Sequence, residues 1–442
     1  MSETRIATTR AERLPTQKLH ASAAGARAAE RETRPAISFF GNFGTQNLGN
    51  ESTLRAILKS VRRHLPGAAV NCICPGPEET TADHGIPAVQ MSYRYGAAFK
   101  ARSQQASNRW VPRLLRRLFV RLPLEIVEWV KAYRALKITR MLVMTGTGML
   151  GDFGIGPFDL HYEIFKWSLL AKIRGAQVLF VSVGAGPIDS RISRWLVKRA
   201  VVLADYRSYR DAFSKSYLAG MGVDTSADPV YPDLAFSLRP EGHGQKGQAR
   251  VVGIGLMDYF GKRWTPASAG VYADYVRNLA GVCDWLLERG YTLRLLIGDL
   301  SYDKHIRADV LEALRLLRPA LPAARIIEEP VTSIENLVAQ LSAIDLLVGT
   351  RFHNLLLAML LNKPAVALSY HEKIDSLMSS VEMGDYVQQI AGLSVEGLIQ
   401  RFTALEKNAG SIKPLLARKV EEARASLERQ YGDIFARFSS DV

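Results

Sequence analysis

A chain of 442 residues, of which 48% are hydrophobic, is long enough for two globular domains and too apolar for an intrinsically disordered protein. Its three cysteines, Cys72, Cys74 and Cys283, are too few to cross-link a chain of this size, which favours a reducing, cytoplasmic compartment. The formal net charge is +14 and is unevenly distributed, and no apolar run is long enough to span a membrane.

The first 34 residues are rich in Ala, Arg, Glu and Thr and contain no apolar stretch. This composition predicts a disordered basic arm over residues 1–34. Strand and helix patterns then alternate, which indicates a parallel, doubly wound sheet and a first Rossmann-like domain over residues 35–240. We expect its strands at 36–40, 70–74, 141–145 and 178–183, and its helices at 51–64, 162–174 and 193–203.

A glycine-rich turn at 41–51 leaves the first strand and enters the first helix. Glycines permit a close backbone approach, and the free N–H groups of a helix N-terminus attract anions. The turn is not a P-loop, because Asn50 and Glu51 stand where a P-loop needs Lys and Ser or Thr. In the ligand-binding interpretation its polar residues contact substrate, namely Asn42, Asn47, Asn50 and Glu51. The alternative is a tight turn in which Asn50 is the helix N-cap.

The segment 94–140 carries twelve Lys or Arg against two Glu, a local charge of +10. Trp110 and Trp129 lie among these basic residues, and Pro112 and Pro123 divide the segment into short helices. A basic, Trp-containing amphipathic segment binds an anionic membrane surface. The equally weighted alternative is a solvated insertion whose apolar side packs on its own domain. No recognition motif accompanies the charge, so nucleic acid is not expected as a partner.

Two further features of the first domain follow predicted strands. The glycine-rich turn at 146–152 contributes Gly148 and Asp152 as candidate substrate contacts. Arg210, followed by Asp211, is interpreted either as a contact to an anionic substrate or as one half of an internal ion pair.

Pro and Gly residues interrupt the pattern at 239–248, so we expect a linker at 241–249 and a second Rossmann-like domain over 250–442. Asp233, just before this break, is interpreted as fixing a turn. We expect the strands of the second domain at 251–254, 293–297, 346–348 and 365–368, and its helices at 272–288, 355–361 and 413–435. Two such domains in series predict a GT-B-like α/β architecture, in which two doubly wound parallel sheets face each other across a ligand-binding crevice.

Arg351 and His353 lie at the carboxyl end of a predicted strand in the second domain. A guanidinium binds a carboxylate or phosphate through two parallel hydrogen bonds, and an imidazole exchanges a proton near neutral pH. Lys373, after the next strand, adds a point charge suited to a phosphate. We therefore predict Arg351 and His353 as catalytic residues and Lys373 as substrate-binding. The alternatives are an ordinary helix start and a solvated surface lysine.

Taken in order, these pieces resemble the polysaccharide pyruvyl transferase family over roughly residues 36–395. They are Gly-Asn-Phe-Gly…Asn-Leu-Gly-Asn-Glu, Gly-Thr-Gly-Met-Leu-Gly-Asp, Val-Gly-Ala-Gly-Pro, Tyr-Arg-Asp, Asp-Pro…Pro-Asp-Leu-Ala-Phe, Gly-Thr-Arg-Phe-His and Ser-Tyr-His-Glu-Lys. The resemblance implies a phosphoenolpyruvate donor and a saccharide acceptor in exopolysaccharide or cell-envelope polysaccharide biosynthesis. It also implies that Arg351 and His353 bind the donor, that His353 is the acid/base, and that Arg210 and Lys373 are further anion contacts. The chain departs from the family at Asn50, where Asp is common, and in the basic segment.

We therefore expect a cytoplasmic transferase, peripheral on the inner face of the plasma membrane, with no metal and no cofactor besides its donor substrate. The acceptor sugar, and whether it is lipid-linked, stay open. One alternative is a GT-B glycosyltransferase that uses a nucleotide sugar, with Glu372 or Asp375 contacting the ribose. The other is a non-enzymatic membrane-surface scaffold, which leaves Arg351 and His353 without a role.

Overall fold

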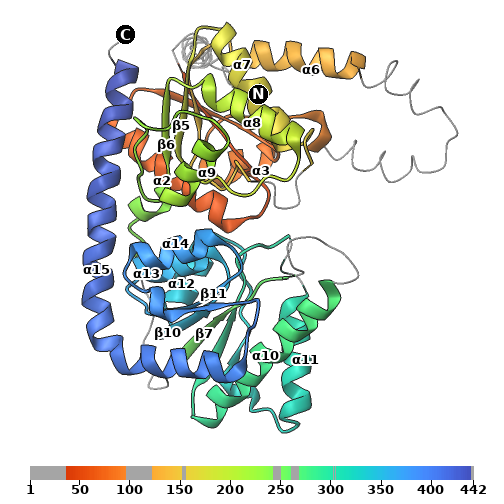
Figure 1. Ribbon diagram of the computed structural model, residues 1–442, viewed down its shortest axis with the longest axis vertical. Coiled ribbons are helices and arrows are strands. Elements are labelled where there is room, and N and C mark those ends of the chain that lie inside the picture. Colours follow the sequence, from red (N-terminus) through yellow and green to blue (C-terminus); the bar gives the residue numbers. More distant parts are fainter. Residues whose placement is uncertain are drawn as a thin grey trace, which may run out of the picture.

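The computed structural model describes residues 36–95, 122–151, 156–241, 250–259, 268–301, 303 and 305–439. The predicted arm, most of the predicted linker and residues 96–121 of the basic segment lie outside the described residues. Figure 1 shows two α/β domains, one above the other along the long axis, each built around its own sheet. The expected pair of doubly wound parallel sheets is confirmed.

The first sheet has six parallel strands in the order β3-β2-β1-β4-β5-β6. The strands are β1 (Ala36–Phe40), β2 (Ala69–Cys74), β3 (Ala88–Gln90), β4 (Thr139–Met144), β5 (Gln177–Val183) and β6 (Tyr206–Tyr209). Its central strands are buried almost throughout, as expected for a parallel sheet with helices on both faces.

Helices cover both faces of this sheet. They are α2 (Leu48–His64), α3 (Pro77–His84), α6 (Leu122–Ala135), α7 (Leu160–Ile173), α8 (Arg191–Val202) and α9 (Ala212–Gly220), with short 3₁₀ turns η1 (Tyr93–Tyr95) and η4 (Leu234–Ser237). Phe39 of β1 belongs to one apolar core with Leu54 of α2. The next residue, Phe40, belongs to a second core with Trp167 of α7 and Val197 of α8. Alternate residues of one strand therefore anchor helices on opposite faces.

The second sheet has the strand order β12-β11-β10-β7-β8-β9 and is also parallel. The strands are β7 (Val251–Gly255), β8 (Thr292–Leu296), β9 (Ile326–Ile327), β10 (Leu346–Gly349), β11 (Ala365–Ser369) and β12 (Val387–Gln389). The surrounding elements are α10 (Ser268–Glu288), α11 (Ile306–Leu317), α12 (Ile334–Ser342), α13 (Phe352–Leu360), α14 (Glu372–Ser380), η5 (Ala323–Arg325) and η6 (Gly384–Tyr386).

The C-terminal helix α15 (Val395–Ser439) ties the two domains together along one side (Figure 1). It is much longer than the predicted helix, because it begins at Val395 and continues through Pro414. Toward its end, Gln430 donates a hydrogen bond to Ser208 of the first domain (2.6 Å), and Arg424 donates to the Phe236 carbonyl (3.2 Å). The last part of the chain therefore packs on the domain that comes first in sequence.

Helix α2 begins three residues before the predicted start, so the prediction that Asn50 is its N-cap is wrong. Asn47 is the cap, and its side-chain oxygen accepts from the N–H groups of Gly49 (3.1 Å) and Asn50 (3.2 Å). Those two N–H groups would otherwise lack partners in the first turn of the helix. The earlier start brings Gly49 and Asn50 into the helix and next to the second domain.

Candidate active site

A small pocket lies between the two domains, at the carboxyl ends of strands from both sheets, and encloses about 110 Å³. Its lining consists of Asn47, Gly49, Asn50, Gly148, Arg210, Gly298, Arg351, Phe352, His353, Asn354, Tyr370 and Lys373. The four predicted catalytic and anion-binding side chains, which are far apart in sequence, therefore line one pocket. Both domains contribute, so neither one makes the site alone.

Arg351 leaves β10 in an extended conformation and is the residue before the first turn of α13. Its Nε donates to Oδ2 of Asp303 (2.9 Å), and its Nη2 donates to Oδ1 of the same buried carboxylate. Burial alone would lower the pKa of Arg351, but the Asp303 carboxylate outweighs it and raises that pKa. Asp303 thus holds the charge of Arg351 in place. It occupies one edge of the guanidinium, which the sequence predicts to bind substrate.

His353 lies in the first turn of α13, with its ring against the backbone of Gly49 in the first domain. A Cβ atom at position 49 would lie 2.0 Å from Nδ1 of His353, so only glycine fits there without displacing the ring. Nε2 of His353 is buried, has no hydrogen-bond partner among the described residues, and lies 3.9 Å from Oδ1 of Asp233. Burial, together with the charges of Arg210 and Lys373, lowers the pKa of His353 to about 3. The imidazole of the unliganded protein is therefore neutral at neutral pH.

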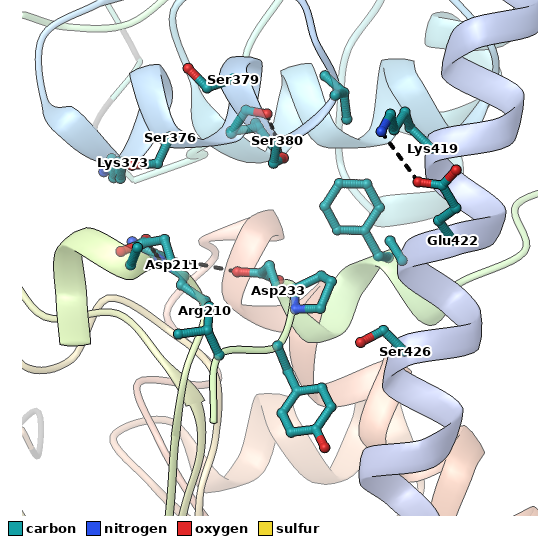
Figure 2. A pocket seen from close by; sticks show the side chains of 18 of the residues that line it. Arg210, Asp211, Asp233, Lys373, Ser376, Ser379, Ser380, Lys419, Glu422 and Ser426 are labelled. Carbon is teal, nitrogen blue, oxygen red and sulfur yellow. Dashed lines mark hydrogen bonds and ion pairs between the residues drawn. The ribbon is translucent and has the colours of Figure 1, made fainter. Parts of the chain in front are cut away.

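Asp233 is a buried carboxylate of the first domain that faces this histidine. Its Oδ1 accepts from the Ala235 N–H (3.0 Å), and its Oδ2 lies 3.6 Å from Nη1 of Arg210 (Figure 2). Burial raises the pKa of Asp233 to about 6, although the nearby Arg210 opposes that shift. In the sequence, Asp233 is interpreted only as part of a turn. Its place beside the histidine could not be seen without the fold.

Arg210 combines the two roles that the sequence left open. Its Nε lies 3.5 Å from Oδ2 of Asp211, so the internal ion pair is present, and its guanidinium also lines the pocket. It lies 4.8 Å from the centre of the Phe352 ring. A Cβ atom at Gly184 would lie 2.5 Å from the guanidinium, so the glycine turn after β5 leaves the space that this side chain needs.

Tyr370 and Lys373 bring a phenol and an ammonium group to the same pocket from the end of β11 and the start of α14. Nζ of Lys373 lies 4.9 Å from the centre of the Tyr370 ring. Burial tends to raise the pKa of Tyr370, but Lys373 and Arg351 outweigh it, and the net pKa is lowered. Lys373, predicted as substrate-binding, therefore lines the pocket, and Tyr370, which was not predicted as a site residue, lines it as well.

Part of the first glycine-rich turn, residues 45–47, holds the two domains together. Asn47 caps α2 with its oxygen and donates through Nδ2 to Oδ2 of Asp299 in the second domain (2.8 Å). Ser301 of the second domain donates to the carbonyl of Thr45 (3.1 Å). Asn50 lines the pocket, and its Nδ2 donates to the Asn42 carbonyl (3.1 Å).

Two of the predicted substrate contacts, Asn42 and Glu51, do not line the pocket. Glu51 is buried, accepts from the Gly44 N–H (2.8 Å), and pairs with Nε2 of His84 (2.9 Å). Glu51 therefore supports the turn from the interior of the first domain. A sequence alone cannot distinguish this role from contact with a ligand. Of the second turn, Gly148 lines the pocket, whereas Asp152 lies outside the described residues.

Several buried polar atoms around the pocket have no hydrogen-bond partner in the described part of the chain. They are Nε2 of His353 and both amide atoms of Asn354, together with Oδ2 of Asp233 and Nε of Arg210, which make the ion-pair contacts described above but no hydrogen bond. Buried polar groups in folded proteins are almost always hydrogen-bonded, because an unpaired one is costly. Their concentration at one point indicates a site built for a polar ligand. In the same described residues, no group of three or more His, Cys, Asp or Glu is arranged to hold a metal ion.

The comparison with protein families agrees with this geometry. The polysaccharide pyruvyl transferase family matches residues 47–372, which include pocket residues from both domains and end one residue before Lys373. The chain belongs to this family. It is therefore a transferase, and the resemblance carried by the ordered motifs is confirmed.

This family member is also similar to proteins with more specific names. It is 22% identical over 416 residues to the amylovoran biosynthesis protein AmsJ of Erwinia amylovora, covering 88% of this chain and 96% of that protein. Two solved structures share its fold. UDP-GlcNAc 2-epimerase from Neisseria meningitidis has a TM-score of 0.53 at 12% identity, covering 89% of this chain and all of that one. The lipopolysaccharide outer core galactosyltransferase WaaB has a TM-score of 0.51 at 12% identity, covering 91% and 99%. These likenesses establish a GT-B-like fold.

Proposed function

We propose that the pocket binds phosphoenolpyruvate and that the protein transfers its pyruvyl group to a saccharide. The observation that supports this most is the convergence of Arg210, Arg351 and Lys373 on a small pocket whose other buried polar atoms lack partners. A small ligand with a carboxylate and a phosphate matches three cations at such close quarters. Membership of the polysaccharide pyruvyl transferase family points to the same donor.

The proposed reaction needs one proton to move onto carbon. Protonation of the methylene carbon of phosphoenolpyruvate makes C2 electrophilic, and a sugar hydroxyl then attacks C2. A second hydroxyl displaces phosphate and closes a ketal, so one hydroxyl proton balances the proton on the new methyl group and the other leaves with phosphate. Arg351, Lys373 and Arg210 stabilise the charges that develop on the donor.

We assign the proton transfer to His353 together with Asp233. The His353 imidazole is neutral in the unliganded pocket because it is buried beside two cations. An anionic donor would offset those cations, raise the pKa of His353 and allow it to carry the proton. Asp233 binds a proton with a pKa of about 6 and lies 3.9 Å from Nε2, so it is the nearby group that exchanges a proton with the imidazole.

A thermal shift assay tests the donor. Phosphoenolpyruvate should raise the melting temperature, and UDP- or GDP-sugars should not, because only the native state binds the correct donor. Stabilisation by a nucleotide sugar alone would favour the GT-B glycosyltransferase alternative. In that alternative Asp375 would contact a ribose, yet it already accepts from Ser369 (2.9 Å) and Gln389 (2.7 Å).

We also propose that the outer face of the first domain binds an anionic membrane surface, where a lipid-linked acceptor would be presented. Helices α6, α7 and α8 lie side by side there (Figure 1). Their exposed apolar side chains include Ile126 (58%) and Val127 (48%) of α6, and Ile192 (49%) and Trp195 (52%) of α8. Single exposed apolar residues are normal, but several of them on two helices that both pack on α7 support an interaction surface.

The charges around this face favour lipid over protein. Arg191, Arg194 and Arg199 are exposed on α8, and Lys131 and Arg134 are exposed on α6. The acidic residues of α6 are already engaged, since Glu125 pairs with Arg94 and Glu128 with Lys131. Lys131 is thus compensated, and the exposed arginines are the cations that favour an anionic surface. Apolar side chains beside exposed cations are typical of proteins that lie on anionic bilayers. No helix in the described ranges is long and apolar enough to cross a membrane. The sequence-based membrane prediction for residues 94–140 stays a prediction, and residues 96–121 of that segment lie outside the described residues.

A further inference from the structure

A second and larger cavity adjoins the pocket and encloses about 530 Å³ (Figure 2). It shares Arg210, Phe352 and Lys373 with the first pocket, so the two cavities are neighbours separated by these side chains. Its walls come from the end of β6 and the turn before η4 in the first domain, from α14 in the second, and from α15, which spans both. This volume falls within the range of about 300–1,000 Å³ typical of ligand cavities. It is far more than a small donor such as phosphoenolpyruvate would fill.

The lining of this cavity is chemically unlike that of the donor pocket. Hydroxyl groups enter from α14 and α15, where Ser376 and Ser426 are both half-buried. Apolar surface comes from Val230, Leu377 and the ring of Phe352. Hydroxyls both donate and accept hydrogen bonds, and apolar faces pack against C–H groups. This combination suits a neutral ligand with many hydroxyls and C–H faces, which describes a sugar.

The charges in the cavity argue against a second anion. Apart from the shared Arg210 and Lys373, the basic group in its wall is Lys419, which pairs with Glu382 (2.6 Å) and Glu422 (3.3 Å). Figure 2 shows the Lys419–Glu422 pair on α15, across the cavity from Arg210. A lysine between two carboxylates has little net attraction left for a phosphate.

We propose that this interdomain cavity binds the saccharide acceptor and that its shared edge, at Phe352 and Lys373, brings the reacting hydroxyl to the donor. The proposal rests on the proposed pyruvyl transfer, because an acceptor is needed only if a donor occupies the adjoining pocket. Holding the two reactants in adjoining spaces is what makes the attack effectively intramolecular. The wall contributed by α15 makes the C-terminal helix part of acceptor recognition.

The test uses α15, where a residue in the cavity wall has an exposed neighbour. Ser426 lines the cavity, whereas the adjacent Ala425 is exposed and does not line it. The variants Ser426→Cys and Ala425→Cys each add one accessible thiol, because Cys72, Cys74 and Cys283 are all buried. Labelling by a maleimide is followed with and without phosphoenolpyruvate and 4-nitrophenyl glycosides of glucose, galactose, mannose and N-acetylglucosamine. A glycoside need not be turned over to be detected in this way.

We expect at least one glycoside to slow labelling of Ser426→Cys by about tenfold at saturation and to leave Ala425→Cys unchanged. A glycoside that raises the melting temperature without slowing the labelling binds elsewhere and overturns the proposal. Slowing by none of the glycosides also overturns it. The donor is scored separately by the thermal shift of the wild-type protein with phosphoenolpyruvate. Protection by a glycoside without any donor effect would therefore reject pyruvyl transfer and keep the saccharide site.

A bulky substitution gives an independent measurement once an acceptor is found. Ser426→Trp should raise the KM for that acceptor by about tenfold or more, because a filled pocket rejects its ligand sterically. It should leave the thermal shift with phosphoenolpyruvate unchanged, and Ala425→Trp should behave like the wild type. An unchanged acceptor KM in a folded Ser426→Trp variant would exclude the cavity as the acceptor site.

Discussion

The two domains contribute to the pocket in different ways. The second domain supplies reactive side chains, Arg351, His353 and Lys373, at the ends of adjacent strands β10 and β11. The first domain supplies fitted backbone at Gly49 and a buried charge pair, Arg210 with Asp233. The second domain thus carries most of the proposed reactive groups. The first domain sets the position and the protonation state of His353. This division of roles can be tested by changing one domain at a time.

The largest effect should come from the second domain, at His353. His353→Ala should lower turnover by about a hundredfold or more, the usual scale for a general acid–base group. The fold should survive, because the side chain makes no hydrogen bond within the described residues through Nε2 and lies at the edge of a pocket. Turnover is measured as phosphate release with an acceptor, and the melting temperature checks the fold. Near-normal turnover would remove His353 from the proton-transfer role.

The matching change in the first domain is Gly49→Ala. The added Cβ would lie 2.0 Å from Nδ1 of His353, so the ring must move and turnover should fall, although no reactive group is removed. Overpacking of this kind typically costs about 1–3 kcal/mol of stability, read from chemical denaturation. The control is Gly432→Ala in α15, where a Cβ meets nothing within 4 Å. It should stabilise the protein by about 0.5–1 kcal/mol. Equal behaviour of the two variants would contradict the close fit at Gly49.

Arg351→Lys tests whether the fork or only the charge of Arg351 matters. An ammonium group cannot reproduce the bidentate contact to Asp303, so the charge is no longer fixed in the pocket. We expect the affinity for phosphoenolpyruvate to fall by about tenfold, with a smaller change in turnover, if the contact acts mainly in ground-state binding. Isothermal titration gives the affinity directly. An unchanged affinity would mean that Arg351 serves only to pair with Asp303.

The sequence was most informative where chemistry and strand ends coincide. Arg351, His353 and Lys373 follow buried apolar strands, so their meeting at one sheet edge was predictable, as was the parallel fold. Asp303 and Asp233 were not predicted, because a carboxylate that faces a histidine or arginine from another element leaves no local pattern. Glu51 was wrongly grouped with pocket residues for the same reason, since its partner His84 is distant in sequence. The short edge strands β3, β9 and β12 have two or three residues, too few for a periodic signal.

Changing Asp233 should affect the pH dependence of stability. The folded-state pKa of Asp233, about 6, is above its ordinary value, so this group adds stability as the pH falls from about 6 to about 4. His353, with a folded-state pKa of about 3, does the opposite and loses stability as the pH falls from about 6.5. In the wild type the two effects oppose each other.

Asp233→Asn removes the stability that Asp233 adds at acidic pH and keeps the stability that is lost at His353. The variant should therefore lose more stability than the wild type between pH 6.5 and 4.5. Urea unfolding at both pH values measures this loss. The contributions of the other carboxylates are the same in both proteins and cancel in the comparison. If the variant instead loses less stability than the wild type over this range, the raised pKa does not belong to Asp233. The double variant Asp233→Asn with His353→Ala lacks both groups. Its free energy of unfolding should therefore change between the two pH values about as much as that of the wild type.

The smallest expected effect concerns the outer faces of the domains, which also differ. In the first domain, several exposed apolar residues lie on α6 and α8, as at Ile192 and Trp195 of α8. In the second, Leu316 of α11 is 81% exposed but has only Leu317 beside it in the chain.

We expect the wild type to co-sediment with anionic vesicles at low salt and less at high salt, because exposed charges are screened beyond roughly 8 Å at physiological ionic strength. Ile192→Ser with Trp195→Ser should lower the bound fraction several-fold, since apolar burial adds to about 1 kcal/mol per basic residue at the surface. Leu316→Ser is the matched control and should bind like the wild type. Equal binding by all three proteins would locate membrane contact elsewhere, and binding to neutral and anionic vesicles alike would exclude the charge-based mechanism.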